Sequence, residues 1–350
     1  MGKVCSFRKG YGIAKDDLSS DGTPCILYGE LYTTYKTAIA KTIKSKTSIQ
    51  SKSLVYSQKD DVIIPCSGET AEDIATSICV PYDGVLLGGD LTVVHSDLDG
   101  AFLSNQINSV RKYDIARIAQ GKSIVHLQAD ELKKIFIFYP SIQEQRKISA
   151  FIDKIDERIE IQNKIISKYE TLIKGLCDMI FRHNKSVSLS DLVKCKTSAL
   201  QENMVSTCHR GEYKVLGASG AIAAIDTYQF EESGILVLKD GSKAGKIQFA
   251  QGKYSVVGTS VVLIPNEACD ARYLYFAMSS IDFEKYKVGS GIPHIYFKDY
   301  SNERIYYPEK ALRKKIIKTL DFYETRVEIE REMLSAMQKQ KAFLLQSMFI

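Results

Sequence analysis

The sequence predicts an α+β fold in which two mixed, strand-rich domains are joined by two long helices that form an antiparallel coiled coil, with a pseudo-twofold internal repeat. The first observation behind this prediction is that residues 121–181 align with residues 289–349 at a constant offset of 168, without a gap. In addition, each copy carries a heptad pattern, and β-prone runs precede each copy. The expected segments are two domains at residues 1–140 and 186–308, and two helices at residues 141–185 and 309–350.

The two domains are expected to share one scaffold. Residues 61–68 resemble residues 234–241 along their length, whereas most of the remaining sequence of the two domains diverges. This pattern predicts equivalent scaffolds that carry different loops. The β-prone runs, which are bounded by Gly, Asp and Ser, are residues 26–28, 62–65, 85–87 and 91–94 in the first domain and residues 235–238, 246–249 and 260–264 in the second.

The first long helix is expected to begin after Pro140, because Ser141 and Glu144 have the spacing of a capping box. Apolar residues then recur at spacings of four and three over more than four heptads in both copies, which favours a coiled coil. The seam residues are Ile148, Ile152, Ile155, Ile159, Gln162, Ile166, Tyr169, Ile173, Leu176 and Ile180 in the first helix, and Ile316, Leu320, Tyr323, Val327, Glu330, Leu334, Met337, Lys341, Leu344 and Met348 in the second.

A whole domain lies between the two helices, which favours an antiparallel pair within one chain, with Ile148 near Met348 and Leu176 near Leu320. The polar seam residues Gln162 and Glu330 occupy equivalent positions near the two helix midpoints. They are either ordinary polar interruptions or a buried polar pair that specifies the register, and the sequence leaves both interpretations open.

The net charge of +5 is not carried by the domains, because residues 1–140 hold 16 basic and 16 acidic side chains and residues 186–308 hold 13 of each. Any nucleic-acid contact must therefore come from local patches. Lysines interleaved with Ser and Thr suit phosphate oxygens, and the alternative for the first patch is a solvated loop. The candidate residues are Lys36, Lys41, Lys44, Lys46 and Lys52 in the first domain, and Lys239, Ser242, Lys243 and Lys246 in the second.

The cysteines and the hydropathy pattern indicate a cytoplasmic protein. Eight cysteines are scattered without a C-x-x-C motif, the first residues lack the apolar core of a signal peptide, and there is no apolar run of 18 residues. Cys208 and His209 are the only adjacent Cys/His pair, and a metal site would need two further ligands. We therefore expect no bound metal.

Catalytic motifs are missing from the sequence. Gly121-Lys122-Ser123 resembles the end of a P-loop, but Ala116 stands where the first glycine belongs. There is no G-x-G-x-x-G, H-E-x-x-H or G-x-S-x-G motif, and no Asn/Asp-Pro-Pro-aromatic tetrapeptide of the kind used to methylate a flipped base. This favours binding over chemistry, and no catalytic residue is predicted.

Several of these segments resemble type I restriction–modification DNA specificity subunits. Residues 140–148, Pro-Ser-Ile-Gln-Glu-Gln-Arg-Lys-Ile, and the helix ending at Phe181 are similar to a conserved region of that family. Residues 289–294, 298–300 and 28–33 also resemble family patterns. One departure is that Leu312-Arg313 replaces Glu144-Gln145 in the second copy, which puts the partner contacts of the second helix start in doubt.

The resemblance implies a DNA reader. Each domain would be a target recognition domain for one half of a bipartite site on double-stranded DNA, and the helices would set the spacing between the halves. Two methyltransferase subunits would dock on the rod and adjoining surfaces, and restriction/translocase subunits would join for cleavage. S-adenosylmethionine, ATP and Mg²⁺ would belong to those partners. The competing interpretations are a coiled-coil adaptor that does not bind DNA and a stand-alone enzyme that turns over without partners.

Overall fold

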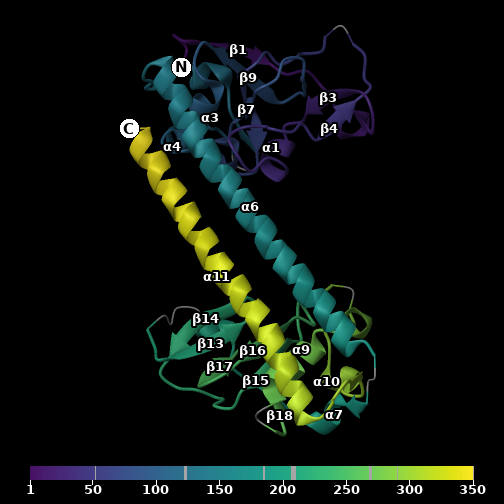
Figure 1. Cartoon of the computed structure of the whole chain (residues 1–350). Helices are drawn as coiled ribbons and strands as arrows, with labels where there is room; N and C mark the ends of the chain where they lie inside the picture. The colour runs from purple at the N-terminus through teal and green to yellow at the C-terminus, as the bar shows by residue number, and fades with distance from the viewer. Residues whose placement is uncertain are drawn as a thin grey trace. The chain divides into compact units, whose positions relative to one another are not determined.

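The computed structural model describes residues 1–51, 53–121, 124–183, 186–205, 210–267, 270–289 and 291–349. The chain divides into two compact units: the first comprises residues 1–163 and 332–350, and the second comprises residues 164–331. Each unit contains one strand-rich domain and part of both long helices, α6 (Ile142–Phe181) and α11 (Lys310–Met348), each of which runs unbroken (Figure 1). No helix in the described part of the chain is long and apolar enough to cross a membrane.

The first domain is built on two four-stranded sheets. One has the order β1-β9-β5-β7 and is antiparallel throughout, the other has the order β2-β4-β3-β8, and β10 pairs with β6. Its elements are β1 (Cys5–Lys9), η1 (Lys15–Asp17), β2 (Leu18–Ser19), β3 (Thr23–Ile26), α1 (Glu30–Thr33), β4 (Ser45–Thr47), β5 (Asp61–Pro65), β6 (Ser67–Gly68), α2 (Ala71–Ile74), β7 (Ile78–Val80), β8 (Leu86–Leu87), β9 (Leu91–Ser96), α3 (Gly100–Asn108), α4 (Lys112–Ile118), β10 (Val125–His126) and α5 (Ala129–Leu132).

The second domain has a matching four-stranded antiparallel sheet with the order β12-β18-β15-β16, a three-stranded sheet β14-β13-β17, and a β11-β19 pair. Its elements are β11 (Val187–Ser188), α7 (Leu189–Leu192), β12 (Val193–Thr197), α8 (Glu202–Val205), β13 (Tyr213–Gly217), β14 (Gly220–Ile225), β15 (Gly234–Leu238), β16 (Ile247–Ala250), β17 (Tyr254–Val256), β18 (Ser260–Pro265), α9 (Ala271–Met278), η3 (Glu284–Tyr286), α10 (Phe297–Tyr300) and β19 (Arg304–Ile305).

The expected equivalence of the two scaffolds is confirmed at the level of the main sheets. The matched segments 61–68 and 234–241 begin with β5 and β15, which lie at the same place in the two strand orders. In each domain one face of the main sheet packs on the helix that follows its longest strand, α3 or α9. The second sheets differ, because β2-β4-β3-β8 has no counterpart of the same order among the described residues of the second domain.

One strand ends earlier than the sequence suggests. Residues 26–28 were expected to be extended, but β3 ends at Ile26. The Glu30 carboxylate accepts a hydrogen bond from the Leu27 amide at 2.7 Å, and the Glu30 amide bonds to the Leu27 carbonyl at 3.0 Å. This turn starts α1 and overrides the β propensity of the apolar run.

Helix α6 begins as predicted. The Ser141 amide donates to the Glu144 carboxylate at 3.3 Å, and the Glu144 amide donates to the Ser141 hydroxyl at 3.4 Å, which is the reciprocal geometry of a capping box. Every predicted seam residue of α6 and α11 is buried or half-buried, which is the pattern expected for a paired helix face.

Within each unit the two helices run antiparallel. In the first unit, Ile148 and Met348 line the same cavity, and Lys341 bonds to Asp156 at 2.5 Å. In the second unit, the rings of Tyr169 and Tyr323 lie 6.4 Å apart, centroid to centroid.

Leu176 packs against the core cluster of the second unit that contains Leu320, which agrees with the antiparallel arrangement of the two helices. The polar seam residues Gln162 and Glu330 are both buried, with 4% of each residue exposed. Arg326 forms an ion pair with Glu330 at 2.8 Å.

The two helix starts are held in the same way by different side chains. Gln145 donates to the Pro140 carbonyl at 2.8 Å and accepts from the Asp99 amide at 3.0 Å. Arg313 donates to the Pro308 carbonyl at 2.7 Å, and its guanidinium donates two hydrogen bonds to the Asp270 carboxylate at 2.9 and 3.1 Å. Arg313 therefore points into its own domain. It forms a buried ion pair at the position where Gln145 of the first copy makes neutral hydrogen bonds.

Candidate nucleic-acid interface

The lysine-rich segment of the first domain is pinned to the edge of the main sheet. The Ala40 amide donates to the Cys79 carbonyl at 2.9 Å, and the Cys79 amide donates to the Ala38 carbonyl at 2.8 Å. Four of the predicted lysines are exposed, whereas the fifth, Lys52, lies outside the described residues. The four are Lys36, Lys41, Lys44 and Lys46.

Among the lysines of this segment that the structure describes, Lys41 is paired with two acidic side chains. Its ammonium lies 2.6 Å from Asp153 and 3.0 Å from Glu157, both on α6. Partial burial acts to lower the pKa of Lys41, but the hydrogen bonds that its ammonium donates to the two carboxylates outweigh this effect, and the pKa is raised. Lys41 is therefore charged and already engaged, which weighs against its expected contact with phosphate.

The other described lysines of the segment, Lys36, Lys44 and Lys46, have different surroundings. Lys36 and Lys44 line a cavity of about 430 Å³ together with Asp156 and Glu160 of α6. Lys46 projects from β4, which is held to α1 because Ser45 donates to Glu30 at 2.7 Å. The predicted lysines therefore differ in the elements that carry them and in the side chains around them.

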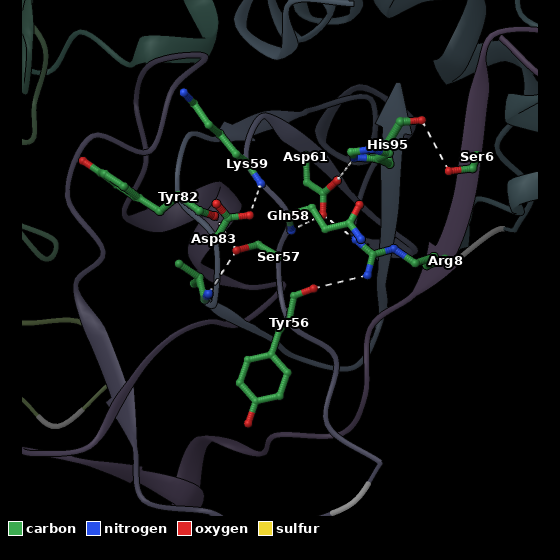
Figure 2. A network of polar contacts seen from close by, with 11 residues as sticks. Ser6, Arg8, Tyr56, Ser57, Gln58, Lys59, Asp61, Tyr82, Asp83 and His95 are labelled. Carbon is green, nitrogen blue, oxygen red and sulfur yellow. Dashed lines mark hydrogen bonds and ion pairs between the residues drawn. The ribbon is translucent and has the colours of Figure 1, made fainter. Parts of the chain in front are cut away.

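A second polar surface of the first domain was not predicted from the sequence. Asp61, at the start of β5, is fully buried, and its carboxylate accepts hydrogen bonds from Arg8 at 2.5 Å and from the Gln58 amide at 2.8 Å, and pairs with His95 Nδ1 at 2.7 Å. Figure 2 shows Arg8 and His95 reaching Asp61 from the neighbouring strands β1 and β9. The buried carboxylate therefore orients two partly exposed cationic or hydrogen-bonding side chains.

This network carries side-chain types suited to base edges. Arg8 also donates to the Tyr56 carbonyl at 3.2 Å, and the Lys59 amide donates to Asp83 at 2.8 Å. Tyr56 and Tyr82 are both exposed large side chains beside it (Figure 2). Arg and other donors that are held in place before binding recognise nucleic acid at low entropic cost. Nothing in the local sequence links positions 8, 61 and 95, so no pattern could have found them.

In the second domain, the predicted basic residues form one compact loop between β15 and β16. Ser242, Lys243 and Lys246 are exposed and Lys239 is half-buried. The ammonium of Lys243 lies 3.4 Å from the Ser219 hydroxyl, and that of Lys246 lies 3.5 Å from the Ala218 carbonyl, so the loop lies against the β13–β14 turn.

Gly245 allows the tight conformation of this loop. Its φ is +89°, and a Cβ there would come within 2.5 Å of Phe283. The predicted second-domain residues are thus brought together by the fold.

The loop is supported by a short motif of the repeat, in which Gly121 and His126 of the first copy recur as Gly289 and His294 of the second. His294 Nδ1 lies 2.8 Å from the Asp240 carboxylate, and the Gly241 amide donates to the Pro293 carbonyl at 2.9 Å. In the first domain the equivalent His126 lies 3.2 Å from the Ser67 hydroxyl. The histidine of each copy therefore contacts the segment that follows β5 or β15. Ser290, Lys122 and Ser123, as well as the Cys208-His209 pair, lie outside the described residues.

Comparison with known proteins identifies the family to which this chain belongs. The family model for the type I restriction modification DNA specificity domain matches residues 1–171 and 182–338. The specificity subunit of the type I restriction enzyme MjaVIII from Methanocaldococcus jannaschii is 27% identical over 122 residues, which is 34% of this chain and 28% of that protein. The match thus spans little more than a quarter of the curated relative.

Solved structures show the same fold. The S subunit of a type I restriction–modification system from M. genitalium aligns over 100% of this chain and 94% of its own length, with a TM-score of 0.66 and 15% identity. A chain from a structure of type I system assembly and conformational transition aligns over 99% of this chain and 96% of its own length, with a TM-score of 0.58 and 16% identity.

Proposed function

We propose that this chain, which belongs to the type I restriction–modification DNA specificity family, reads a bipartite site on double-stranded DNA with two target recognition domains at residues 1–140 and 186–308. The observation that carries the proposal is the pair of matching antiparallel sheets with different second sheets and loops. A shared scaffold keeps both domains in the same relation to their helix, and different loops let each domain recognise a different half-site.

In this proposal the two domains touch DNA through basic side chains at their surfaces. In the first domain these are Lys36, Lys44, Lys46 and Lys52, whereas Lys41 is engaged by α6. In the second domain they are Lys239, Lys243 and Lys246, with Ser242 near a base or a phosphate. Phosphate contacts set position and affinity, whereas sequence is read by other side chains.

The chain itself is proposed to be non-catalytic. Two methyltransferase subunits would dock on the helices and adjoining surfaces, and restriction/translocase subunits would join for cleavage. S-adenosylmethionine would then be bound by the methyltransferase subunits, and ATP and Mg²⁺ by the subunits that cleave DNA. The role of this chain is to select the site and hold the enzymes there.

The test is to co-express the chain with a methyltransferase subunit of its own system and map adenine methylation in the host genome. A bipartite motif is expected. Exchanging residues 1–139 for those of another family member should change one half of the motif, and exchanging residues 186–308 should change only the other half. If one exchange in a folded protein alters both halves, the two domains are not independent readers. Loss of all sequence-specific DNA binding, with the partner bound, would favour the coiled-coil adaptor.

The spacing between the two halves provides a second test. Inserting seven residues at equivalent seam positions of α6 and α11 lengthens the pair by about 10 Å, or about three base pairs of DNA. The spacer in the methylated motif should grow by about that number, and both half-sites should be unchanged. An unchanged spacer would show that the helices do not set the separation.

The phosphate contacts can be tested by salt dependence. Replacing Lys44 and Lys46 by Gln should weaken binding to cognate and unrelated DNA alike, and should flatten the slope of log affinity against log salt by about 0.9 for each phosphate that is no longer neutralised. Lys134→Gln, an exposed lysine on another part of the same domain, is the matched control. An unchanged slope in the double variant, with the complex intact, would mean that these lysines serve only to solvate the loop.

A further inference from the structure

We infer that Lys41 and Arg272 are positioning residues that clamp each recognition domain to the long helices through acids at one repeated position, Asp153 and Asp321. The inference rests on the proposed DNA-reading function, and it assigns Lys41 a role different from phosphate contact. The two acids are separated by the repeat offset of 168 residues, so they occupy the same turn of α6 and α11.

The acidic half of the clamp is shared, and the basic half is not. Lys41, from the segment between α1 and β4, lies 2.6 Å from Asp153. Arg272, from α9, lies 2.5 Å from Asp321 through Nε and also pairs with Glu324. The repeat therefore keeps one helix position acidic while two unrelated elements supply the cation. Such convergence on one contact is unexpected if the ion pairs are incidental surface contacts.

In the first domain the clamp orders the lysine segment. Backbone bonds to β7 hold the segment at Ala38 and Ala40, and the Tyr82 hydroxyl donates to the Lys41 carbonyl at 2.6 Å. The Lys41 ammonium then reaches Asp153 and Glu157, so the segment is tied to the sheet on one side and to α6 on the other. Lys36 and Lys44 border the cavity beneath this bridge. The bridge therefore orders Lys36 and Lys44 before DNA binds, and its loss adds a cost of ordering without removing a phosphate contact.

In the second domain, aromatic side chains as well as acids surround the cation of the clamp. The Arg272 guanidinium lies 4.7 to 5.1 Å from the ring centroids of Phe249, Tyr275 and Phe276, and the Tyr275 hydroxyl donates to Glu324 at 3.2 Å. An arginine suits this place, because its planar group both stacks on rings and forks onto carboxylates. The α9 helix itself is part of the main core, so here the cation is supplied by a rigid element.

The two roles of Lys41 make opposite predictions for its acidic partners. If Lys41 binds phosphate, removing the carboxylates frees its charge, and DNA binding stays the same or tightens. If Lys41 is a clamp, removing the carboxylates loosens the segment, and binding weakens although the protein has become more basic. A partly exposed ion pair is screened by solvent, so the expected loss is about two- to five-fold in affinity.

The test uses the full chain in complex with its methyltransferase subunit. Asp153→Asn with Glu157→Gln should bind cognate DNA about two- to five-fold more weakly, with an unchanged salt slope. Lys41→Glu should be impaired further, and adding Asp153→Lys to it should restore most of the binding by reversing the pair. Lys44→Gln is the matched control, because removal of a phosphate-binding charge changes the slope. Amide exchange of residues 38–44, measured without DNA, should be faster in the acid variants and should recover in the reversed pair.

The inference is overturned if the acid variants bind DNA as well as or better than the unmodified chain, or if the reversed pair stays as impaired as Lys41→Glu. Unchanged amide exchange of residues 38–44 in the acid variants would also overturn it. Because the exchange measurement needs no DNA, it distinguishes the two proposals: a chain that never binds DNA contradicts the proposed function, while faster exchange in the acid variants still supports the clamp.

Discussion

Replacing Arg313 by Ala is expected to destabilise the second unit much more than the equivalent change, Gln145→Ala, destabilises the first. The side chains of Arg313 and Asp270 are only 8% and 4% exposed, and they form a bidentate ion pair. The guanidinium also lies 4.1 Å from the Tyr307 ring centroid and bonds to the Pro308 carbonyl. Removing it leaves a buried carboxylate with the Tyr307 hydroxyl as a remaining donor.

The magnitude follows from that geometry. Breaking one side of a buried ion pair costs about 3–5 kcal/mol, because the remaining charge stays desolvated. Tyr307 still donates to Asp270, so a value near the lower end of that range, about 3 kcal/mol, is expected. Gln145→Ala removes two neutral hydrogen bonds at the other helix start and should cost about 1–2 kcal/mol. The double change Asp270→Asn with Arg313→Gln restores a neutral pair, and should recover a large part of the loss.

Native-state hydrogen exchange is the suitable assay, because a chain of two units has no single unfolding free energy. Protection of α9 amides reports on the second unit, and protection of α3 amides reports on the first. Arg313→Ala should lower protection in α9 and leave α3 unchanged, and Gln145→Ala should do the reverse with a smaller effect. The reasoning is refuted if Arg313→Ala costs α9 less than about 1 kcal/mol, or no more than Gln145→Ala costs α3.

Three further predictions concern the first unit. Ile152 is fully buried in the seam, so Ile152→Ala should cost about 2–5 kcal/mol of local stability by hydrogen exchange, while the exposed Ile161→Ala should cost less than about 0.5. Burial outweighs the attraction of Lys341 and raises the pKa of Asp156 above its ordinary value of 3.8, so stability from this group is fully present below 3.8 and is lost as pH rises through the raised pKa. Asp156→Asn should make the stability of the unit fall less steeply with rising pH. A variant with the same dependence of stability on pH as the unmodified chain would contradict this prediction. Burial and, to a lesser extent, the charge of Glu30 raise the pKa of the Cys25 thiol to about 11. Iodoacetamide should therefore label Cys25 slowly in the native chain at about pH 8, and faster once denaturant is added. Rapid labelling of the native chain would show that the thiol is accessible.

Much of the architecture could be predicted from the sequence, because it depends on local periodicity and on a repeat. Patterns within a few residues predict the seams of the two helices and the capping box of Ser141 and Glu144. Similarity between residues 61–68 and 234–241 predicts the equivalence of β5 and β15. Apolar residues at heptad spacing form one face of a helix whatever the rest of the chain does. These features therefore appear in the structure where the sequence placed them.

The candidate site was only partly predictable, because side-chain partners are chosen by the fold. Lys41 looked like its neighbours in sequence, yet its ammonium finds Asp153, which is distant along the chain, whereas Lys46 projects from a separate strand. Arg8, Asp61 and His95 come from three strands whose order, β1-β9-β5, differs from their order in the sequence. The two scaffolds and the helical repeat could therefore be predicted from the residues alone, since they depend on local periodicity and a constant offset. The pairing of charges became visible only in the folded chain, because electrostatic partners depend on distance in space, which local patterns do not encode.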